Sequence, residues 1–209
     1  MIIQRAKSEE LVDKIDNMWY SYLVSFPADA QRTKIEIKER LKPIIENGFK
    51  REIFYATDSN TQELQTIGVY HINQNFPFCY GEYIWTKNSV QNNLNGTNIH
   101  FSCIDFLKES GIKYFICEGH EDNLWHHKIG LGLIPVDYLQ PAISEKQQDV
   151  NMTLLYDVNL GPNPFKSEDL LTIINEIFIG IYDCKFNGTK YEKTIQKSIN
   201  GRKDLKIKL

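Results

Sequence analysis

Long hydrophobic runs are absent from this sequence of 209 residues. No stretch approaches the roughly 18 consecutive apolar residues of a membrane-spanning helix, so we expect no membrane contact. The segment Met1–Lys7 lacks the apolar core and the small-residue cleavage site of a secretory signal, which favours a cytoplasmic protein. Positive charge is not in excess, because 24 lysines and arginines stand against 27 aspartates and glutamates. The net charge of −3 argues against a nucleic-acid-binding protein.

Cysteine is also scarce, and its spacing carries little information. With no export signal, reduced thiols are a simpler explanation than disulfides. Cys117 and His120 are spaced like a pair of metal ligands, but Cys117 lies in an apolar segment and no second pair has matching spacing. We therefore expect no metal site. The four cysteines are Cys79, Cys103, Cys117 and Cys184.

The chain does contain enough apolar material for a core, since 42% of its residues are hydrophobic. Leu160–Pro164 holds two prolines and a glycine in five residues, which interrupts regular structure. We place a boundary here, between a first domain over 1–160 and a helical extension over 161–209. An apolar stripe within 167–182 predicts an amphipathic helix that packs on its own domain or forms a homodimer contact.

The spacing of apolar residues changes along the chain and predicts its secondary structure. Ser8 precedes a three-to-four apolar pattern and predicts a helix that ends at Phe26. We expect further helices over 33–46, 96–110, 123–129 and 167–182, strands over 2–6, 52–57, 66–72, 76–86, 113–118, 136–140 and 150–158, and a basic, frayed helix over 191–209.

The order of these elements predicts the fold class. The three strands between residues 52 and 86 are joined by short polar loops, as in an antiparallel meander. The strand at 76–86 and the strand at 113–118 are separated by a helix, and such a crossover makes parallel neighbours. We therefore expect an α/β fold with a mixed, mostly antiparallel sheet, a central parallel strand pair, flanking helices and the C-terminal helical extension.

In this order of elements the chain resembles the GNAT acetyltransferase superfamily over about residues 1–158. The signature of that family is a Gln or Arg, two residues, Gly, one residue, then Gly or Ala, at the start of the helix after the fourth strand. It falls on Gln91–Gly96, with Leu94 in place of the first glycine. The register of the family is also kept at Glu82, Gly111, Glu118, Asn123 and the pair Gly130-Leu131.

This resemblance implies that the protein binds acetyl-CoA or another acyl-CoA and transfers the acyl group to a small-molecule amine. In the family the acyl-CoA lies between the fourth and fifth strands. The implied cofactor contacts are Ile84, Trp85, Thr86, Gln91, Asn92, Asn93, Leu94, Asn95, Gly96, Thr97 and Asn123.

The loop has a physical rationale of its own. A helix N-terminus exposes unpaired N–H groups and the positive end of the helix dipole, so it accepts phosphate oxygens. Glycine lets the backbone approach an anion, and asparagine tolerates left-handed backbone better than most residues. Leu94 does not, so we expect it to narrow the phosphate site or to pack inward with a changed loop shape. The alternative is a plain turn that binds nothing.

The resemblance also implies the catalytic groups. Glu82 occupies a position where some family members keep a base. His126 aligns with the acid in the next helix and can donate a proton near neutral pH. Tyr138 is another candidate proton donor. For Glu82 the alternative to a catalytic base is an ordinary solvated carboxylate.

The acceptor is less defined by the sequence. In the family the acceptor groove is built by the first two helices, their loop and the late strands. Asp29 in that loop could attract an amine and Arg32 a carboxylate. Two other functions stay open: a non-catalytic sensor or interaction protein that binds CoA or another ligand in the cleft, and an enzyme of the same fold that does not use acetyl-CoA.

Overall fold

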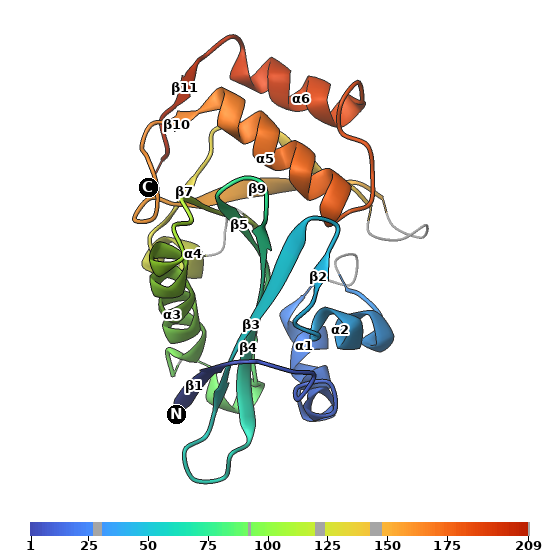
Figure 1. Ribbon diagram of the computed structural model, residues 1–209, viewed down its shortest axis with the longest axis vertical. Helices are drawn as coiled ribbons and strands as arrows, with labels where there is room; N and C mark the ends of the chain where they lie inside the picture. Colours follow the sequence, from blue (N-terminus) through green and yellow to red (C-terminus); the bar gives the residue numbers. More distant parts are fainter. Residues whose placement is uncertain (27–30, 92, 120–123, 143–147, 209) are drawn as a thin grey trace.

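One sheet organises the part of the molecule that the structure describes (Figure 1). The computed structural model describes residues 1–26, 31–91, 93–119, 124–142 and 148–208. Within them, nine strands form the sheet in the order β1-β3-β4-β5-β6-β9-β7, with β2 paired to β3 and β8 paired to β9. The strands are β1 Ile2–Arg5, β2 Ile45–Glu46, β3 Phe49–Thr57, β4 Leu64–Asn73, β5 Phe78–Thr86, β6 Tyr114–Gly119, β7 Leu131–Leu133, β8 Tyr138–Gln140 and β9 Val150–Asp157.

Helices flank this sheet, and a short strand pair, β10 with β11, lies apart from it. The remaining elements are η1 Lys14–Met18, α1 Trp19–Ser25, α2 Lys34–Arg40, η3 Asn88–Val90, α3 Asn95–Glu109, α4 Leu124–Lys128, β10 Phe165–Lys166, α5 Ser167–Gly180, α6 Lys190–Ile199 and β11 Asp204–Leu205. No helix of the described residues has both the length and the apolar character that crossing a bilayer requires.

The pairing of the strands confirms the expected fold class. Strands β3, β4 and β5 form an antiparallel meander, and β5 pairs with β6 in parallel after the α3 crossover. The other pairs of the main sheet are antiparallel. The fold is therefore a mixed α/β fold with a central parallel pair.

The parallel pair is short, and this positions the site. It runs from Phe78 opposite Tyr114 to Gly81 opposite Cys117, and the rest of β5 has no partner in β6. The register of β5 on β4 shifts at the same level, where Tyr70 faces Gly81 and Val69 faces Tyr83. Glu82 is thus the extra residue of a β-bulge, which bends a strand and increases its twist. The two strands separate beyond this point.

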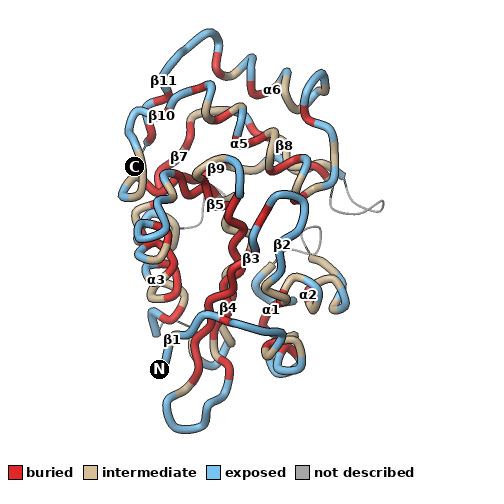
Figure 2. The backbone as a smooth tube through the Cα atoms, in the orientation of Figure 1, coloured by how far each residue is buried: buried red, intermediate tan, exposed pale blue. Residues whose placement is uncertain are grey.

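Each face of the sheet has its own buried cluster (Figures 1 and 2). Under α1 and α2, Tyr22 and Ile37 pack against Trp85 of β5. On the opposite face, Ile99 and Leu107 of α3 pack against Phe115 of β6. Side chains of β5 belong to both clusters, because successive strand residues point to opposite faces.

The C-terminal helices cover a third cluster. Leu170, Ile174 and Phe178 of α5 are fully buried and pack with Phe78 of β5 and Ile116 of β6. The apolar stripe expected within 167–182 therefore packs within its own chain. The division into 1–160 and 161–209 stays a prediction.

Several expected boundaries were wrong. The helix expected over 33–46 ends at Arg40, and Ile45–Glu46 instead pairs with β3. Pro43 explains this, since proline lacks the N–H that a helix interior needs. The helix expected from Ser8 begins only at Lys14, as the 3₁₀ helix η1, and continues as α1. In the tail expected as a frayed helix over 191–209, α6 ends at Ile199 and β11 follows.

We predict that Gly161→Ala destabilises the protein, because the atoms around Gly161 leave no space for a Cβ. A Cβ built on Gly161 would lie 2.1 Å from the carbonyl oxygen of Lys113 and 2.2 Å from the hydroxyl of Tyr156. Overpacking of this kind costs about 1–3 kcal/mol, which urea unfolding measures directly. Gly96→Ala is the matched control, since its Cβ would meet nothing closer than 3.6 Å. Equal stability of the two variants would contradict the packing argument.

Candidate functional site

The separation of β5 and β6 opens a cleft of about 920 Å³. Its floor includes Ile84, Trp85 and Thr86 of β5, three of the expected cofactor contacts. The side chain of Trp85 is buried in the cluster under α1 and α2, while Ile84 packs with the α3 cluster. The cleft therefore lies beside the part of β5 that no longer pairs with β6.

The N-terminus of α3 forms one wall of the cleft. Asn95, Gly96 and Thr97 begin this helix of 15 residues and line the cleft. Their N–H groups belong to the first turn, which has no intrahelical acceptors, and the helix dipole adds positive potential there. This wall is suited to an anion such as a phosphate.

Leu94 takes the backbone conformation that a glycine favours. Its φ of 58° lies in the left-handed region, and it caps α3. Its side chain is 65% exposed, so it does not pack inward as one expectation had it. A left-handed conformation costs a non-glycine residue about 1–2 kcal/mol. At Leu94 the loop therefore has the left-handed backbone that a glycine would adopt, at an energetic cost. The exposed leucine side chain lies at the edge of the cleft.

The remaining expected cofactor residues divide into three groups. Gln91 lines the cleft. Asn93 is exposed and is not among the residues lining it. Asn92 and Asn123 lie outside the described residues, as do Asp29 and His120.

The carboxylate of Glu82 is buried among cationic and polar groups. Its Oε2 lies 2.6 Å from His71 Nε2, and its Oε1 lies 3.5 Å from Arg40 Nε and 3.7 Å from Arg32 Nε. The bulge places Glu82 and Tyr83 on one face, and Arg32 reaches both, since its Nε also donates to the Tyr83 hydroxyl at 2.8 Å.

These partners determine the charge of Glu82. Burial alone raises the pKa of a carboxyl group, but His71, Arg40 and Arg32 together lower that of Glu82 to about 2. Burial lowers the pKa of His71 despite its contact with Glu82. Glu82 is therefore a fixed negative charge across the physiological range.

A second carboxylate, Glu118 at the end of β6, has a different environment. Its Oε1 accepts a hydrogen bond from the Tyr138 hydroxyl. Its Oε2 accepts from the hydroxyls of Tyr80 and Tyr182 and from Gln140 Nε2. All four donors are neutral. Burial raises the pKa of Glu118 more than these hydrogen bonds lower it.

His126 of α4 also lines the cleft. Its ring lies against the β6 backbone, where a Cβ on Gly119 would fall 2.5 Å from His126 Cε1. The neighbouring Trp125 donates from Nε1 to Thr97 Oγ1 at 3.1 Å and so ties α4 to the start of α3. In the part of the chain that the structure describes, no three His, Cys, Asp or Glu side chains gather as metal ligands would.

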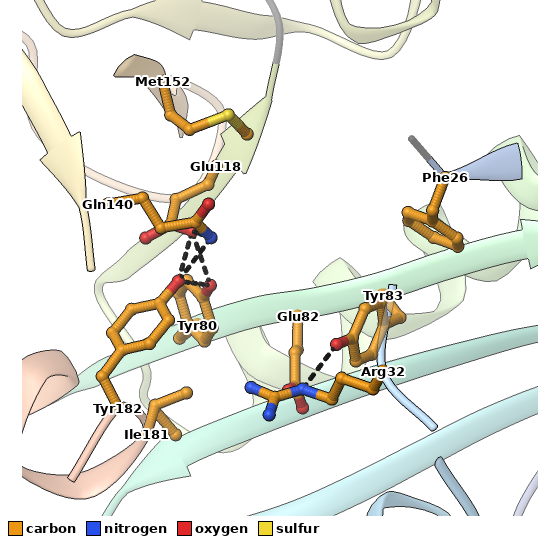
Figure 3. A pocket seen from close by; sticks show the side chains of 10 residues that line it. All are labelled: Phe26, Arg32, Tyr80, Glu82, Tyr83, Glu118, Gln140, Met152, Ile181 and Tyr182. Atoms are coloured by element: carbon orange, nitrogen blue, oxygen red, sulfur yellow. Dashed lines mark hydrogen bonds and ion pairs between the residues drawn. The ribbon is translucent and has the colours of Figure 1, made fainter. Parts of the chain in front are cut away.

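A smaller pocket of about 90 Å³ adjoins the cleft (Figure 3). The two cavities share Glu82, Glu118 and Tyr83, together with Phe26 and Met152. Arg32 lies at one end of the pocket beside Tyr83, and the Glu118 cluster lies at the other (Figure 3). A large cleft and a small pocket therefore meet at two carboxylates.

Sequence reasoning placed Glu82, His126, Arg32 and Tyr138 near the site but gave Tyr80 and Tyr182 no role. Tyr80 could have been found, because it lies two residues before Glu82 and residues at that spacing share a strand face. Tyr182 follows α5 and has no local signal, since only the packing of α5 brings it to Glu118.

Comparison with known proteins identifies the architecture. No family model matches the chain, and no curated protein sequence does either. Among solved structures, a protein from Bacteroides thetaiotaomicron described as a GNAT-family acetyltransferase superposes with a TM-score of 0.66 at 19% identity, covering 88% of this chain and 100% of the other.

Two further structures agree with it. The aminoglycoside 6'-acetyltransferase type Ii superposes at a TM-score of 0.56 and 14% identity, covering 78% of this chain and 100% of the other. The ribosomal-protein-alanine N-acetyltransferase from Brucella melitensis superposes at 0.53 and 12% identity, covering 75% and 98%. At such identities the likeness concerns the fold alone: the chain has the GNAT acetyltransferase fold.

Proposed function

We propose that the protein transfers an acyl group, in the simplest case acetyl, from acyl-CoA to a small-molecule amine. One observation carries the proposal: a large cleft and a small pocket meet at Glu82 and Glu118, where β5 and β6 separate. Two substrates bound in these cavities would present their reacting ends to each other, and such proximity is a major source of rate enhancement.

The large cleft suits the acyl-CoA. Its phosphates would lie at the first turn of α3, near Asn95, Gly96 and Thr97, where N–H groups and the helix dipole favour anions. The end of β5 that has no partner in β6, over Ile84 to Thr86, would accept the extended pantetheine amide groups. The acyl-CoA supplies an activated thioester, so the protein has mainly to position the two reactants.

The amine must lose a proton as the new C–N bond forms and the C–S bond breaks. A general base works best when its pKa lies near the operating pH. Glu82, the base implied by the resemblance, has a pKa lowered to about 2. The raised pKa of Glu118 suits it better to accept a proton. We therefore propose Glu118 as the proton acceptor, with Glu82 as the alternative.

The leaving thiolate would take its proton from His126, which lines the cleft. Tyr138, the other candidate, is buried and donates to Glu118 instead. The small volume of the pocket, about 90 Å³, favours a small amine over a protein side chain as the acceptor.

We predict that CoA stabilises the protein and that Gly96→Val removes most of this effect. At a hundred times its Kd a ligand stabilises by about 2.7 kcal/mol, a shift of about 5–11 °C in Tm for a chain of this size. The added methyls of valine must displace Ile84 and Thr86, whose atoms lie 3.6 Å from an ideal Cβ, or enter the cleft. Thermal melts with acetyl-CoA, longer acyl-CoAs and free CoA measure the shift.

Gly96→Ala is again the matched control, because its single methyl fits at ordinary contact distance. It should keep the full CoA shift. Equal CoA shifts for wild type and Gly96→Val would refute the phosphate assignment, and the absence of any shift in wild type would refute the acyl-CoA proposal. A CoA shift without acyl transfer to any amine would favour the sensor function.

A second prediction separates the two carboxylates by their pH dependence. If Glu118 is the base, kcat at saturating substrates falls as the pH drops through its raised pKa, because the protonated carboxyl cannot accept a proton. Glu118→Gln should lower kcat by about 10²- to 10⁴-fold and abolish this acid limb. Glu82→Gln should slow transfer at least about tenfold without changing CoA affinity, because it releases Arg32, and should keep the acid limb.

Folding must be checked for Glu82→Gln, since it removes the negative charge beside two half-buried guanidinium groups. His126→Phe should have a smaller effect than either. An acid limb that survives in Glu118→Gln and vanishes in Glu82→Gln would reverse the assignment.

A further inference from the structure

The small pocket has a guanidinium group at one end and a carboxylate with neutral partners at the other, and this distribution bears on which amine it accepts. Its polar lining comprises Arg32, Tyr80, Glu82, Tyr83, Glu118, Gln140 and Tyr182. Phe26, Met152 and Ile181 supply the apolar part of the lining. Figure 3 shows Arg32 beside Glu82 and Tyr83, with the Glu118 cluster set apart from them.

At the Glu118 end the negative charge has no counter-ion. Within the described ranges Glu118 makes no ion pair, and its four hydrogen-bond donors are neutral. Three of them bond to Oε2 and one, from Tyr138, to Oε1. Each carboxylate oxygen accepts about two hydrogen bonds, so Oε1 retains room for one more donor. A partly buried carboxylate without a counter-charge favours a cation.

At the Arg32 end a guanidinium group borders the pocket. Arg32 and Arg40 both lie beside Glu82, and both also help to lower the pKa of Glu36. Arg32 uses its Nε for the Tyr83 hydroxyl and Glu82. Among the described residues its two terminal nitrogens make no hydrogen bond, and its side chain, 10% exposed, lines the pocket. A guanidinium fork of this kind matches a carboxylate.

We infer that the acceptor is a small zwitterion, a short molecule that carries both the reacting amine and a carboxylate. The inference rests on the proposed acyl transfer. The ammonium group binds at Glu118 Oε1 and the carboxylate at the terminal nitrogens of Arg32, while Phe26, Met152 and Ile181 cover the carbons between them. The volume of about 90 Å³ limits the enclosed part to a few atoms, since a cavity of about 150 Å³ is filled by benzene.

The C-terminal extension takes part in this recognition. Ile181 and Tyr182 follow α5 and both line the pocket. The Tyr182 hydroxyl donates to Glu118 and accepts from Gln140 Nε2 at 2.8 Å. Residues beyond Leu160 therefore help to set the acceptor specificity as well as covering the sheet.

The test is a matched acceptor panel with acetyl-CoA, read as release of the CoA thiol. The zwitterions are glycine, β-alanine, L-alanine and 4-aminobutyrate, and their partners without a carboxylate are glycinamide, β-alaninamide, L-alaninamide and 4-aminobutyramide. At least one zwitterion should exceed its partner about tenfold or more in kcat/KM, the effect of one charged hydrogen-bonded pair.

The variant Arg32→Gln should lower kcat/KM for that zwitterion by about 10- to 100-fold, mostly through KM, and lower that of its partner without a carboxylate by much less. Arg40→Gln is the matched control, because Arg40 pairs with the same oxygen of Glu82 but does not line the pocket. It should leave the ratio between the two acceptors unchanged. Tyr182→Phe should raise KM for the zwitterion without changing CoA stabilisation.

Two results would overturn the inference while leaving acyl transfer intact: equal use of zwitterions and their partners without a carboxylate by wild type, or an equal loss for both in Arg32→Gln. CoA stabilisation without transfer to, or thermal stabilisation by, any zwitterion would also overturn it. Failure of the proposed function itself is distinct, because then CoA neither stabilises the protein nor releases its thiol with any amine.

Discussion

The separation of β5 from β6 beyond Gly81 and Cys117 is the constraint on which the rest of the site depends. Two parallel strands that stayed paired to their ends would leave no gap between them. The bulge at Glu82 adds one residue to β5 and bends it, and the pairing with β6 stops at the same level. The large cleft, the first turn of α3 and the small pocket all border this gap.

The same bulge also determines which charged groups surround Glu82. Glu82 and Tyr83 lie on one face, which regular alternation would forbid, and Arg32 contacts both. Glu82 is thereby held ionised by cations, while Glu118 on the neighbouring strand is held by neutral donors. Two carboxylates at one gap thus acquire different properties, which is the condition for dividing charge stabilisation and proton transfer between them.

The sequence predicted what depends on local pattern. The meander, the crossover helix and the parallel pair follow from apolar spacing and turn residues, and the loop before α3 was located from register. It did not predict what depends on tertiary contacts. The bulge at Glu82 leaves no mark in the apolar pattern. Tyr182 reaches Glu118 only because α5 packs back over the sheet. Leu94 has a left-handed backbone, which a leucine disfavours.

The central claim is that the first turn of α3 binds the phosphates of an acyl-CoA. A ¹H–¹⁵N amide titration of the labelled protein with CoA tests it most directly, because the proposed ligands are backbone N–H groups. The account predicts that the largest shifts fall on Asn95, Gly96 and Thr97, followed by Ile84–Thr86, the end of β5 that has no partner in β6. Shifts confined to other parts of the chain, or none at millimolar CoA, would contradict it.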